Sequence, residues 1–507
     1  MDFGNNNNSK NRLPVLIIGG GISGLVLANV LQAQGVPYKV FERDLSPTSR
    51  SQGWAIGLDF GLAILKATIG PEKYDTLGKQ TAVDSDHPER GAMTMVDGNA
   101  NKRILMLSPP PNTDMFRINR TRLRAWLLKD IMEADCIVWN KIFESYTIIM
   151  TDKEKEDGSG KDHVIVEVTF TDGTTERGSI LVGADGTNSH VCRQLIGSNL
   201  FEQTTLTSDV KNLASSYWID QKFRDEIVES YGPAHVVAPG SGTEDEASTC
   251  MFFSLVDVNF SRKEAPYHMM WSMSYLDDDD DADDDDNNEK DNNKKNNNVY
   301  SLTTSTQQQS SQEKKNRQQQ QQHDSEKLLK IAKARITRCG FSGPLLQLVM
   351  ETPQNSNVGS LLFKERSPCS SLQEMASNTN NRIVLIGDSS HSMIQLCGSG
   401  GNHAIADACF LGSALASAYK KDEEKALEEA VYMFYKETIP RGQEAVVAAH
   451  KTADAFHGTR ETVREYMNSI LQQASSLATI DNTETHCWKK KMDPELLARY
   501  NNNNPKL

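Results

Sequence analysis

A glycine-rich turn near the amino terminus, Gly19–Gly24 (GGGISG), lies between an apolar run and a helical pattern. The run Leu13–Ile18 (LPVLII) has the length and composition of a buried parallel strand. After the turn, Leu25–Gly35 places apolar residues at helical spacing and ends in a glycine. Tyr38–Phe41 (YKVF) is typical of a second strand. This order predicts a strand–helix–strand unit and an α/β fold with a parallel sheet.

The turn has the chemistry of a dinucleotide site. Gly19, Gly21 and Gly24 fit G-x-G-x-x-G, in which glycines let a diphosphate approach backbone N–H groups at a helix N-terminus. Glu42 ends the second strand, where an acid accepts hydrogen bonds from adenosine ribose hydroxyls and disfavours a 2′-phosphate. The motif alone does not separate FAD from NAD, because both contain ADP.

Two further glycine-and-acid motifs lie far along the chain. Gly183–Gly186 (GADG) follows a predicted hairpin, and Gly387-Asp388 follows the apolar run Ile383–Ile386. A glycine cluster, Gly398–Asn402, then precedes an Ala-rich helical pattern at Ala404–Ala418. Their wide separation indicates one extended cofactor that is contacted by distant parts of the chain.

The acidic charge is concentrated in one low-complexity tract. The formal net charge is -14, and Asp277–Asn298 alone contains ten Asp and one Glu against three Lys. The tract continues as Ser, Thr, Gln and Asn to residue 325, and it has too few apolar residues to offset the entropy of ordering, so we expect disorder over 277–325. The overall charge argues against a nucleic-acid partner.

Other features exclude several classes of protein. The eight cysteines form no C-x-x-C pair and none has zinc-like spacing with histidines, so we expect no metal site. No apolar stretch is long enough to span a membrane, and the amino terminus lacks a signal-peptide pattern. We therefore expect a cytoplasmic protein. The alternative is a peroxisomal one, because Pro505-Lys506-Leu507 loosely resembles an S-K-L tail.

Taken together, the three motifs resemble those of the group A FAD-dependent monooxygenases, which include aromatic hydroxylases and epoxidases. The resemblance extends over nearly the whole chain outside 277–325, and includes R-x-x-L at Arg120 and Leu123. It implies an α/β fold with a Rossmann-like FAD-binding domain interleaved with a β-sheet substrate domain, plus C-terminal helices. The implied ranges are 1–12 as a disordered amino terminus, 13–200 and 376–450 as a discontinuous FAD-binding domain, 201–375 as the substrate domain interrupted by 277–325, and 451–507 as C-terminal helices and a polar tail.

The resemblance also implies which residues bind FAD non-covalently. Asp388 would accept hydrogen bonds from the ribityl chain, and the helix near Asn402 would direct its positive end at the pyrimidine edge of the flavin. Two positions depart from the family pattern: Gln395 replaces a proline, and Cys192 holds the place of an arginine. The implied cofactor-binding residues are Gly19, Gly21, Gly24, Glu42, Arg43, Gly53, Arg120, Asp185, Asp388, Gly398, Gly400, Gly401 and Asn402.

The reaction implied by the resemblance consumes NADPH or NADH and O₂. Reduced FAD forms a C4a-hydroperoxide, whose distal oxygen hydroxylates an aromatic ring or epoxidises an olefin of a small biosynthetic intermediate. Some relatives that hydroxylate phenols hold a phenolate with an arginine and a tyrosine. Arg193 and Tyr217 are candidates for that catalytic pair, against the alternative that they are a motif arginine and a packing aromatic.

The sequence is compatible with two other functions. One is a FAD-dependent reductase or dehydrogenase on the same fold, similar to polyprenyl reductases. The other is a non-catalytic flavoprotein whose low-complexity insertion binds partners. The sequence leaves open the substrate, the choice between NADH and NADPH, and the oligomeric state.

Overall fold

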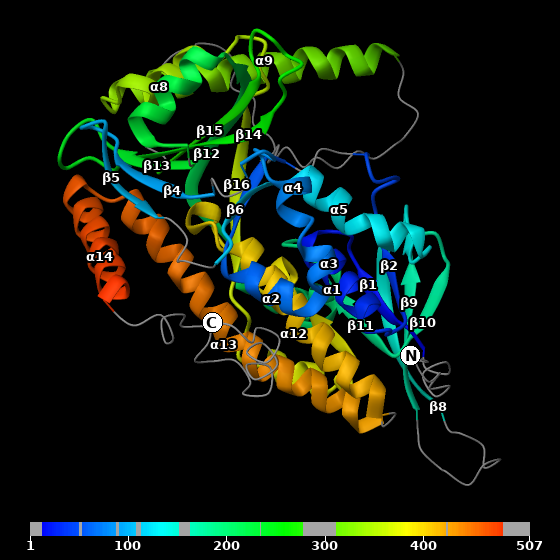
Figure 1. Ribbon diagram of the computed structural model, residues 1–507. Helices are drawn as coiled ribbons and strands as arrows, with labels where there is room; N and C mark the ends of the chain where they lie inside the picture. The colour runs from blue at the N-terminus through cyan, green and yellow to red at the C-terminus, as the bar shows by residue number, and fades with distance from the viewer. Residues whose placement is uncertain are drawn as a thin grey trace, which may run out of the picture.

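The computed structural model describes residues 13–49, 53–87, 91–107, 113–151, 163–233, 235–276, 311–421 and 424–479. Two sheets organise these residues, one in a lower domain and one in an upper domain as oriented in Figure 1. The predicted disordered amino terminus, 1–12, and the polar tail after residue 479 lie outside the described residues.

The lower domain is built on a five-stranded parallel sheet. Its strand order is β17-β11-β1-β2-β7, so the predicted β1–α1–β2 unit lies near its centre. The strands are short and almost wholly apolar, as expected for parallel strands covered on both faces. Their bounds are β1 Val15–Ile18, β2 Tyr38–Phe41, β7 Ile137–Val138, β11 Ile180–Gly183 and β17 Ile383–Leu385.

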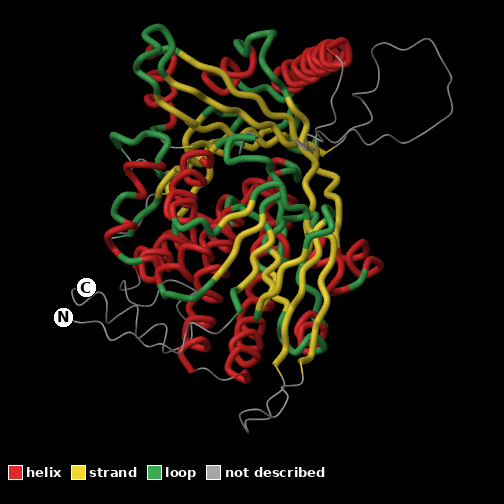
Figure 2. Tube along the Cα trace, turned by 90° about the vertical axis from the view of Figure 1, so that its right-hand side faces the viewer, coloured by secondary structure: helices red, strands yellow, loops and turns green. Residues whose placement is uncertain are grey.

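Helices and a smaller sheet cover this parallel sheet. Helix α1 (Ile22–Ala33) packs on α12 (Gly400–Lys421) and on α5 (Arg120–Glu133). The antiparallel sheet of β8 (Phe143–Thr151), β9 (His163–Phe170) and β10 (Thr175–Gly178) joins the same core, where the rings of Phe41 and Phe170 are 4.8 Å apart. Figure 2 shows most of the red helices to the left of these strands. The predicted hairpin is confirmed as β9–β10 as far as Gly178. Residues 180–182, which were predicted to continue its second strand, instead belong to β11 of the parallel sheet.

The upper domain is a seven-stranded mixed sheet with the order β16-β12-β15-β14-β13-β4-β5. Helices α8, α9 and α10 pack on one of its faces, and the end of α13 together with α14 packs on the other. The strands are β4 Met93–Asp97, β5 Lys102–Leu107, β12 Thr205–Ile219, β13 His235–Gly240, β14 Thr249–Val258, β15 Tyr267–Leu276 and β16 Gly359–Arg366.

A two-stranded antiparallel ribbon lies between the two domains. It pairs β3 (Ala55–Leu58) with β6 (Phe116–Asn119), and both strands contact β14. Because side chains alternate along a strand, the ribbon has two different faces. Leu58 and Ile118 join the core of the lower domain, whereas Ala55 packs against the core of the upper domain.

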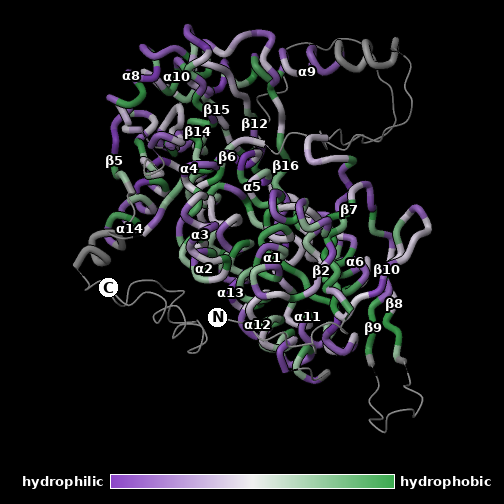
Figure 3. Tube along the Cα trace, turned by 45° about the vertical axis from the view of Figure 1, so that its right-hand side comes forward, coloured by the Kyte–Doolittle hydropathy of each residue, from purple (hydrophilic) through white to green (hydrophobic). Residues whose placement is uncertain are grey.

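The remaining elements complete the two domains. Figure 3 shows green, hydrophobic stretches along β8 and β9 and purple, hydrophilic ones around α8 in the outer helical layer. The bounds are α2 Phe60–Ile69, α3 Pro71–Tyr74, α4 Leu77–Thr81, α6 His190–Ile196, α7 Ser198–Thr204, α8 Gln221–Tyr231, α9 Ser311–Arg338, α10 Gly343–Met350, α11 Leu372–Ser377, α13 Glu424–Phe456 and α14 Arg460–Thr479, with 3-10 turns at Gly387–Ser389 and Gln395–Cys397.

The structure differs from the sequence expectations in two places. Helix α9 begins at Ser311, so the prediction of disorder is wrong for 311–325, while 277–310 lies outside the described residues. The Gln-rich stretch is helical because it continues into a helix whose later residues, such as Leu329 and Ile336, are buried in the upper core. Strands β4 and β5 belong to the seven-stranded sheet, although they fall inside 13–200, the range predicted for the FAD-binding domain.

We expect the substitution Gly412→Leu to destabilise the lower domain. A Cβ atom at Gly412 would lie 2.5 Å from Cγ1 of Val30, so added bulk must separate α12 from α1. Overpacking of this kind costs about 1–3 kcal/mol, which thermal unfolding would detect as a lower Tm. Ser413→Leu, at the half-buried next position, is the control and should change the Tm little; equal losses in the two variants would contradict the prediction.

Candidate functional site

The first glycine turn is closely packed at Gly19 and Gly24 but open at Gly21. Gly19 has φ +111°, and a Cβ atom there would lie 2.4 Å from the carbonyl oxygen of Ala184. A Cβ atom at Gly24 would lie 2.1 Å from the Gly19 carbonyl oxygen, whereas at Gly21 no atom lies within 4 Å. Gly21 caps α1 without a side-chain hydrogen bond, and the first turn of α1 has no acidic residue. The amide groups at this helix end therefore suit a diphosphate.

Glu42, predicted to bind the adenosine ribose, also holds the backbone of this turn by hydrogen bonds. Its side chain is buried, and its Oε2 accepts a hydrogen bond from Gly20 N at 2.5 Å. Its Oε1 accepts one from Asp44 N at 2.9 Å. Each carboxylate oxygen has a second lone pair, which leaves capacity for a ribose hydroxyl. Arg43, also predicted to contact the cofactor, is exposed.

A buried arginine that sequence reasoning missed supports the same turn. Arg124 donates from Nε to the Gly20 carbonyl oxygen at 3.1 Å and from Nη1 to the Pro47 carbonyl oxygen at 2.9 Å. Its Nη2 also lies 3.9 Å from Glu42 Oε2. The R-x-x-L match drew attention to Arg120, but nothing in the sequence indicates that Arg124 reaches back to the glycine turn.

The structure brings together Gly53, Arg120 and Asp388, which are far apart in the sequence. Gly53 has φ +83°, and a Cβ atom there would lie 3.2 Å from Arg120 Nη1. The positive charge of Arg120 also acts on the Asp388 carboxyl, although burial among protein atoms dominates and raises the pKa of Asp388. Asp388 is nevertheless solvent-exposed between two buried neighbours. Asp388 therefore lies among protein atoms but keeps accessible surface, as a ribityl-binding acid would.

The turn that carries Asp388 touches both long helices of the lower domain. Gly387 has φ +59°, and a Cβ atom there would lie 3.1 Å from the Ser23 side chain of α1 and 3.2 Å from Ala404 of α12. Only a glycine allows this close approach without moving either helix. The first and third sequence motifs thus meet at one place.

The glycine cluster before α12 has a partly structural role. Gly398 has φ +65°, and a Cβ atom there would contact nothing within 4 Å. Gly401 packs near Ile56 and Leu58 of β3, at 3.3 and 3.5 Å from a Cβ atom. Oδ1 of Asn402 accepts hydrogen bonds from Asp59 N at 2.9 Å and Gly61 N at 3.2 Å, so its side chain holds the start of α2. Gly400 is the first residue of α12.

The GADG motif forms the beginning of α6. Asp185 accepts hydrogen bonds from the Ser189 hydroxyl at 2.5 Å and from His190 N at 2.7 Å. Desolvation raises the pKa of Asp185, while these donors oppose that shift. Its predicted contact with the cofactor stays a prediction, since the carboxylate already serves as a helix cap.

Arg366, at the end of β16, is the main residue that sequence reasoning missed. It is 2% exposed, and it donates from Nη1 to the Ser389 carbonyl oxygen at 3.0 Å and from Nη2 to the Thr187 carbonyl oxygen. Its Nε donates to the Thr205 hydroxyl at 2.9 Å. Arg366 thereby ties the loop after GADG to the turn that carries Asp388.

Arg366 lies beside the position at which the family pattern has an arginine. Burial raises the pKa of the Cys192 thiol to about 12, so Cys192 is neutral and does not supply the missing charge. The positive charge of Arg366 acts on Cys192 and on the carboxyl groups of Asp185 and Asp388. The guanidinium of Arg366, from the upper domain, therefore lies near Cys192, the position at which the family pattern has an arginine.

The predicted catalytic pair is not found. Arg193 lies on α6, where it pairs with Glu202 at 2.5 Å and stacks on Phe201. Tyr217 packs against the upper core, and its hydroxyl donates to the Leu348 carbonyl oxygen of α10 at 2.9 Å. Tyr217 is twelve strand positions from Thr205, which contacts the Arg366 group, so roughly 40 Å separates the two ends of β12. Tyr217 thus faces the outer helical layer.

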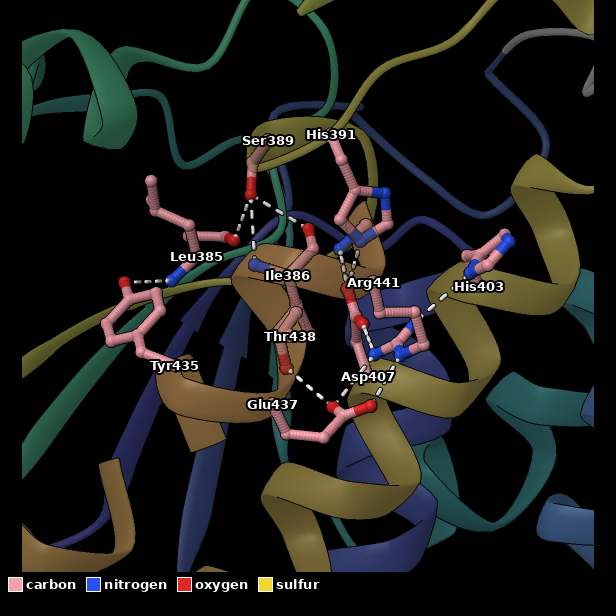
Figure 4. A network of polar contacts seen from close by, with 12 residues as sticks. Leu385, Ile386, Ser389, His391, His403, Asp407, Tyr435, Glu437, Thr438 and Arg441 are labelled. Carbon is pink, nitrogen blue, oxygen red and sulfur yellow. Dashed lines mark hydrogen bonds and ion pairs between the residues drawn. The ribbon is translucent and has the colours of Figure 1, made fainter. Parts of the chain in front are cut away.

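A buried polar network holds the third motif in place (Figure 4). The carboxylate of Asp407 on α12 accepts hydrogen bonds from Gly387 N at 2.7 Å and from Arg441 Nη2 at 2.6 Å, and it bonds to His391 Nε2 at 2.7 Å. Burial alone would raise the pKa of Asp407, but His391 and Arg441 hold this pKa well below its usual value. His391 is therefore a structural partner of the turn.

The network continues from Arg441 to two more side chains. Arg441 Nε donates to Glu437 Oε1 at 2.8 Å, and Nη1 lies 3.0 Å from His403 Nδ1. Burial and the positive charge of Arg441 lower the pKa of His403 to about 3. His403 is thus neutral and its Nδ1 accepts the hydrogen bond from Arg441.

No group of three or more His, Cys, Asp and Glu side chains in the described ranges is placed to hold a metal ion. No described helix is long and apolar enough to cross a membrane.

Comparison with known proteins agrees with this site. The family model described as "FAD binding domain" matches residues 12–57 and 363–449, which contain the first and third motifs. The chain is 26% identical to the FAD-dependent monooxygenase dbaB of Emericella nidulans, over 80% of this chain and 88% of the relative. It is 25% identical to the FAD-dependent monooxygenase thnD of Trichoderma harzianum, over 87% of this chain and 93% of the relative.

Over most of its length the chain is thus similar in sequence to FAD-dependent monooxygenases. Solved structures share its fold. Klebsiella pneumoniae HpxO, complexed with FAD and uric acid, superimposes with a TM-score of 0.58 at 16% identity, covering 92% of this chain and 95% of that chain. Pseudomonas aeruginosa PqsL in complex with 2-aminobenzoylacetate gives a TM-score of 0.57 at 16% identity, covering 88% and 96%. The predicted flavoprotein monooxygenase fold is confirmed.

We expect Arg366→Met to weaken FAD binding. Removing the guanidinium leaves two loops of the cofactor site without their shared donor, and loss of a buried charge-assisted contact should raise the Kd for FAD at least about tenfold. Flavin fluorescence titration of the apoprotein measures this constant.

Arg193→Met is the matched control, because both arginines stack at 4.1 Å from the Phe201 ring centroid but Arg193 is bonded to Glu202 on the surface. Its Kd for FAD should stay within about twofold of wild type, as expected for an exposed ion pair. Unchanged FAD affinity in Arg366→Met would contradict the role given to Arg366.

The low pKa of His403 predicts a pH-dependent loss of stability. The folded state binds this proton only near pH 3, whereas the unfolded chain binds it near pH 6.5, so acidification favours unfolding. Between pH 7 and pH 5 the loss attributable to His403 is up to about 2 kcal/mol. His403→Asn keeps an acceptor for Arg441 but does not titrate. Denaturant unfolding at the two pH values should therefore show a smaller loss in this variant; an equal loss would refute the prediction.

Proposed function

We propose that this enzyme uses NADPH or NADH and O₂ to hydroxylate an aromatic ring, or epoxidise an olefin, of a small organic biosynthetic intermediate. The observation that carries this proposal is the meeting of the GGGISG and Gly387-Asp388 turns against α1 and α12. Motifs that are distant in the sequence share one elongated site, as one extended dinucleotide requires. Relatives that match most of this chain are named FAD-dependent monooxygenases.

In this proposal each part of FAD has its own set of residues. The N-terminus of α1, with Gly19, Gly21 and Gly24, takes the diphosphate, and Glu42 takes the adenosine ribose. Asp388 and Arg120 would contact the ribityl chain. When bound, FAD supplies the redox chemistry that couples NAD(P)H oxidation to oxygen transfer.

The residues around α12 have an electrostatic task. The glycines at 398, 400 and 401 allow the backbone to approach the flavin, and the positive end of α12 stabilises negative charge that develops on reduction. The Asp407 network fixes this helix relative to the Gly387 turn, so the donors keep their orientation during the reaction. The upper domain closes over this region and excludes water from the reacting centre.

Rapid-scan stopped-flow spectroscopy tests the proposal before any substrate is known. FAD-loaded enzyme is reduced with NADPH without oxygen and then mixed with oxygenated buffer. We expect a transient spectrum, distinct from those of oxidised and reduced FAD, before the oxidised spectrum returns. Slow reoxidation in one featureless phase would favour a reductase instead. Failure of the protein to retain FAD would overturn the cofactor assignment as well.

Product analysis then separates oxygen transfer from reduction. With an active phenolic or olefinic compound, a monooxygenase incorporates one atom from ¹⁸O₂ into the product. A reductase gives unlabelled product, and its turnover persists without oxygen.

A further inference from the structure

A polar pocket lies between the β3–β6 ribbon and strands β13 and β14 of the upper domain. It is separate from the glycine turns and is lined by charged and polar residues that the reaction described above does not use. The polar lining residues are Asp84, His87, Arg117, Arg224, His235 and Ser254.

The alternation of the ribbon directs Arg117 into this pocket. Arg117 on β6 pairs with Gly57 on β3, so both are on the same face of the ribbon. The neighbouring Ile118 and Leu58 face the other way and join the lower core, near Gly401 and α12. The guanidinium therefore faces the upper domain, across the ribbon from the start of α12.

The upper sheet offers a matching polar face. Met251 and Phe253 of β14 pack against the outer helical layer, so the alternate residues Phe252 and Ser254 face the ribbon. The guanidinium carbon of Arg117 lies 5.2 Å from the Phe252 ring centroid, and Nε donates to the Ser254 hydroxyl at 2.8 Å. Ser254 in turn donates to the Leu255 carbonyl oxygen at 2.9 Å, which fixes the direction of the hydroxyl.

Arg117 is buried without a counter-ion in the described part of the chain. It is 7% exposed, and no described ion pair involves it. Because Nε is bonded to Ser254, the two terminal amino groups, Nη1 and Nη2, remain as donors. A buried cation of this kind is costly unless an anion pairs with it. Desolvation accordingly lowers the pKa of Arg117 to about 9.

His235 adds a second unused polar group. Its side chain is 8% exposed, and the buried Nδ1 atom has no hydrogen-bond partner among the described residues. Burial, and then the charge of Arg117, lower the pKa of His235 well below its usual value, so the ring is neutral. A neutral imidazole offers one N–H donor and one acceptor.

The charges of the lining leave an excess of positive charge. Arg224 is a second cation, with Nη2 bonded to the Pro233 carbonyl oxygen at 3.0 Å, and Asp84 is the acidic side chain of the lining. The lining thus contains two guanidinium groups and one carboxylate. Gly57 leaves space opposite Arg117, since a Cβ atom there would lie 3.9 Å from His235 Cε1 and contact nothing closer.

We propose that Arg117, oriented by Ser254 and flanked by His235, binds a carboxylate of the substrate. The two terminal amino groups of a guanidinium match the two oxygens of a carboxylate, a pairing that a point charge does not reproduce. The assignment rests on the proposed function, because it takes the ligand to be the monooxygenase substrate. It narrows the substrate class to carboxylated aromatic or olefinic compounds.

Calorimetric titration of the FAD-loaded enzyme with 2-naphthoate and its neutral isostere 2-naphthamide tests this site. We expect wild type to bind the carboxylate at least about tenfold more tightly than the amide, as a charged hydrogen-bonded pair predicts. In Arg117→Met the preference should disappear, with amide affinity unchanged. Arg117→Lys keeps the charge but loses the fork, so it should retain part of the preference.

Two further variants test whether the effect comes from net charge and whether the ligand occupies the space beside Arg117. Arg177→Met removes a cation from exposed β10 and should bind like wild type, which excludes an effect of net charge. Gly57→Val fills the space opposite Arg117 with a residue that suits a strand, and it should weaken both ligands. A Tm and FAD content equal to wild type show that each variant is folded.

The outcomes separate this proposal from the proposed function. No saturable binding of 2-naphthoate, or equal affinity in wild type and Arg117→Met, would overturn the carboxylate site. Carboxylate binding that depends on Arg117, together with featureless reoxidation in the stopped-flow experiment, would keep the anion site but reject its assignment to a monooxygenase substrate.

Discussion

The buried carboxylate of Asp407 is the contact on which the lower domain depends most. It joins the backbone of the Gly387 turn, the His391 ring and the Arg441 guanidinium, which come from three different segments. A charge with no exposed surface is tolerated only when its lone pairs are satisfied, and here every partner is also part of the cofactor site or of the helix behind it. The turn that carries Asp388 is therefore positioned by electrostatics as well as by packing.

The same principle applies where the two domains meet. Arg366 belongs to β16 of the upper sheet, yet its hydrogen bonds go to carbonyl oxygens at Thr187 and Ser389 in the lower domain. Its buried guanidinium lies beside Cys192, where the family pattern has an arginine and this chain does not. The cofactor site is thus completed by a residue from the domain proposed to hold the substrate, which makes FAD binding sensitive to how the domains are packed.

The sequence predicted the parts of the fold that are encoded locally. The GGGISG turn, its flanking strand and helix, and the β9–β10 hairpin have short-range patterns, and the structure confirms them. Arg366 and Arg117 carry no such pattern, because their partners are distant in the sequence. Tyr217 was misplaced for another reason. β12 is buried on both faces at Asn212–Ser215 and half-buried at Tyr217, so the burial expected from its sequence does not say which side meets the cofactor.

The described chain passes several times between the two domains, which limits where the sequence can be cut to separate one domain from the other. The chain leaves the lower domain for β4 and β5, returns for β6 to α7, leaves again for β12 to β16, and returns for β17 and α12. Helix α13 then carries it from Arg441, bonded to Asp407, to Phe456 under the upper sheet. No single cut in the sequence yields a fragment that contains one whole domain and none of the other. A single crossover with a relative would therefore divide at least one domain between two parents, so cofactor binding and substrate selection are not separated by one such event.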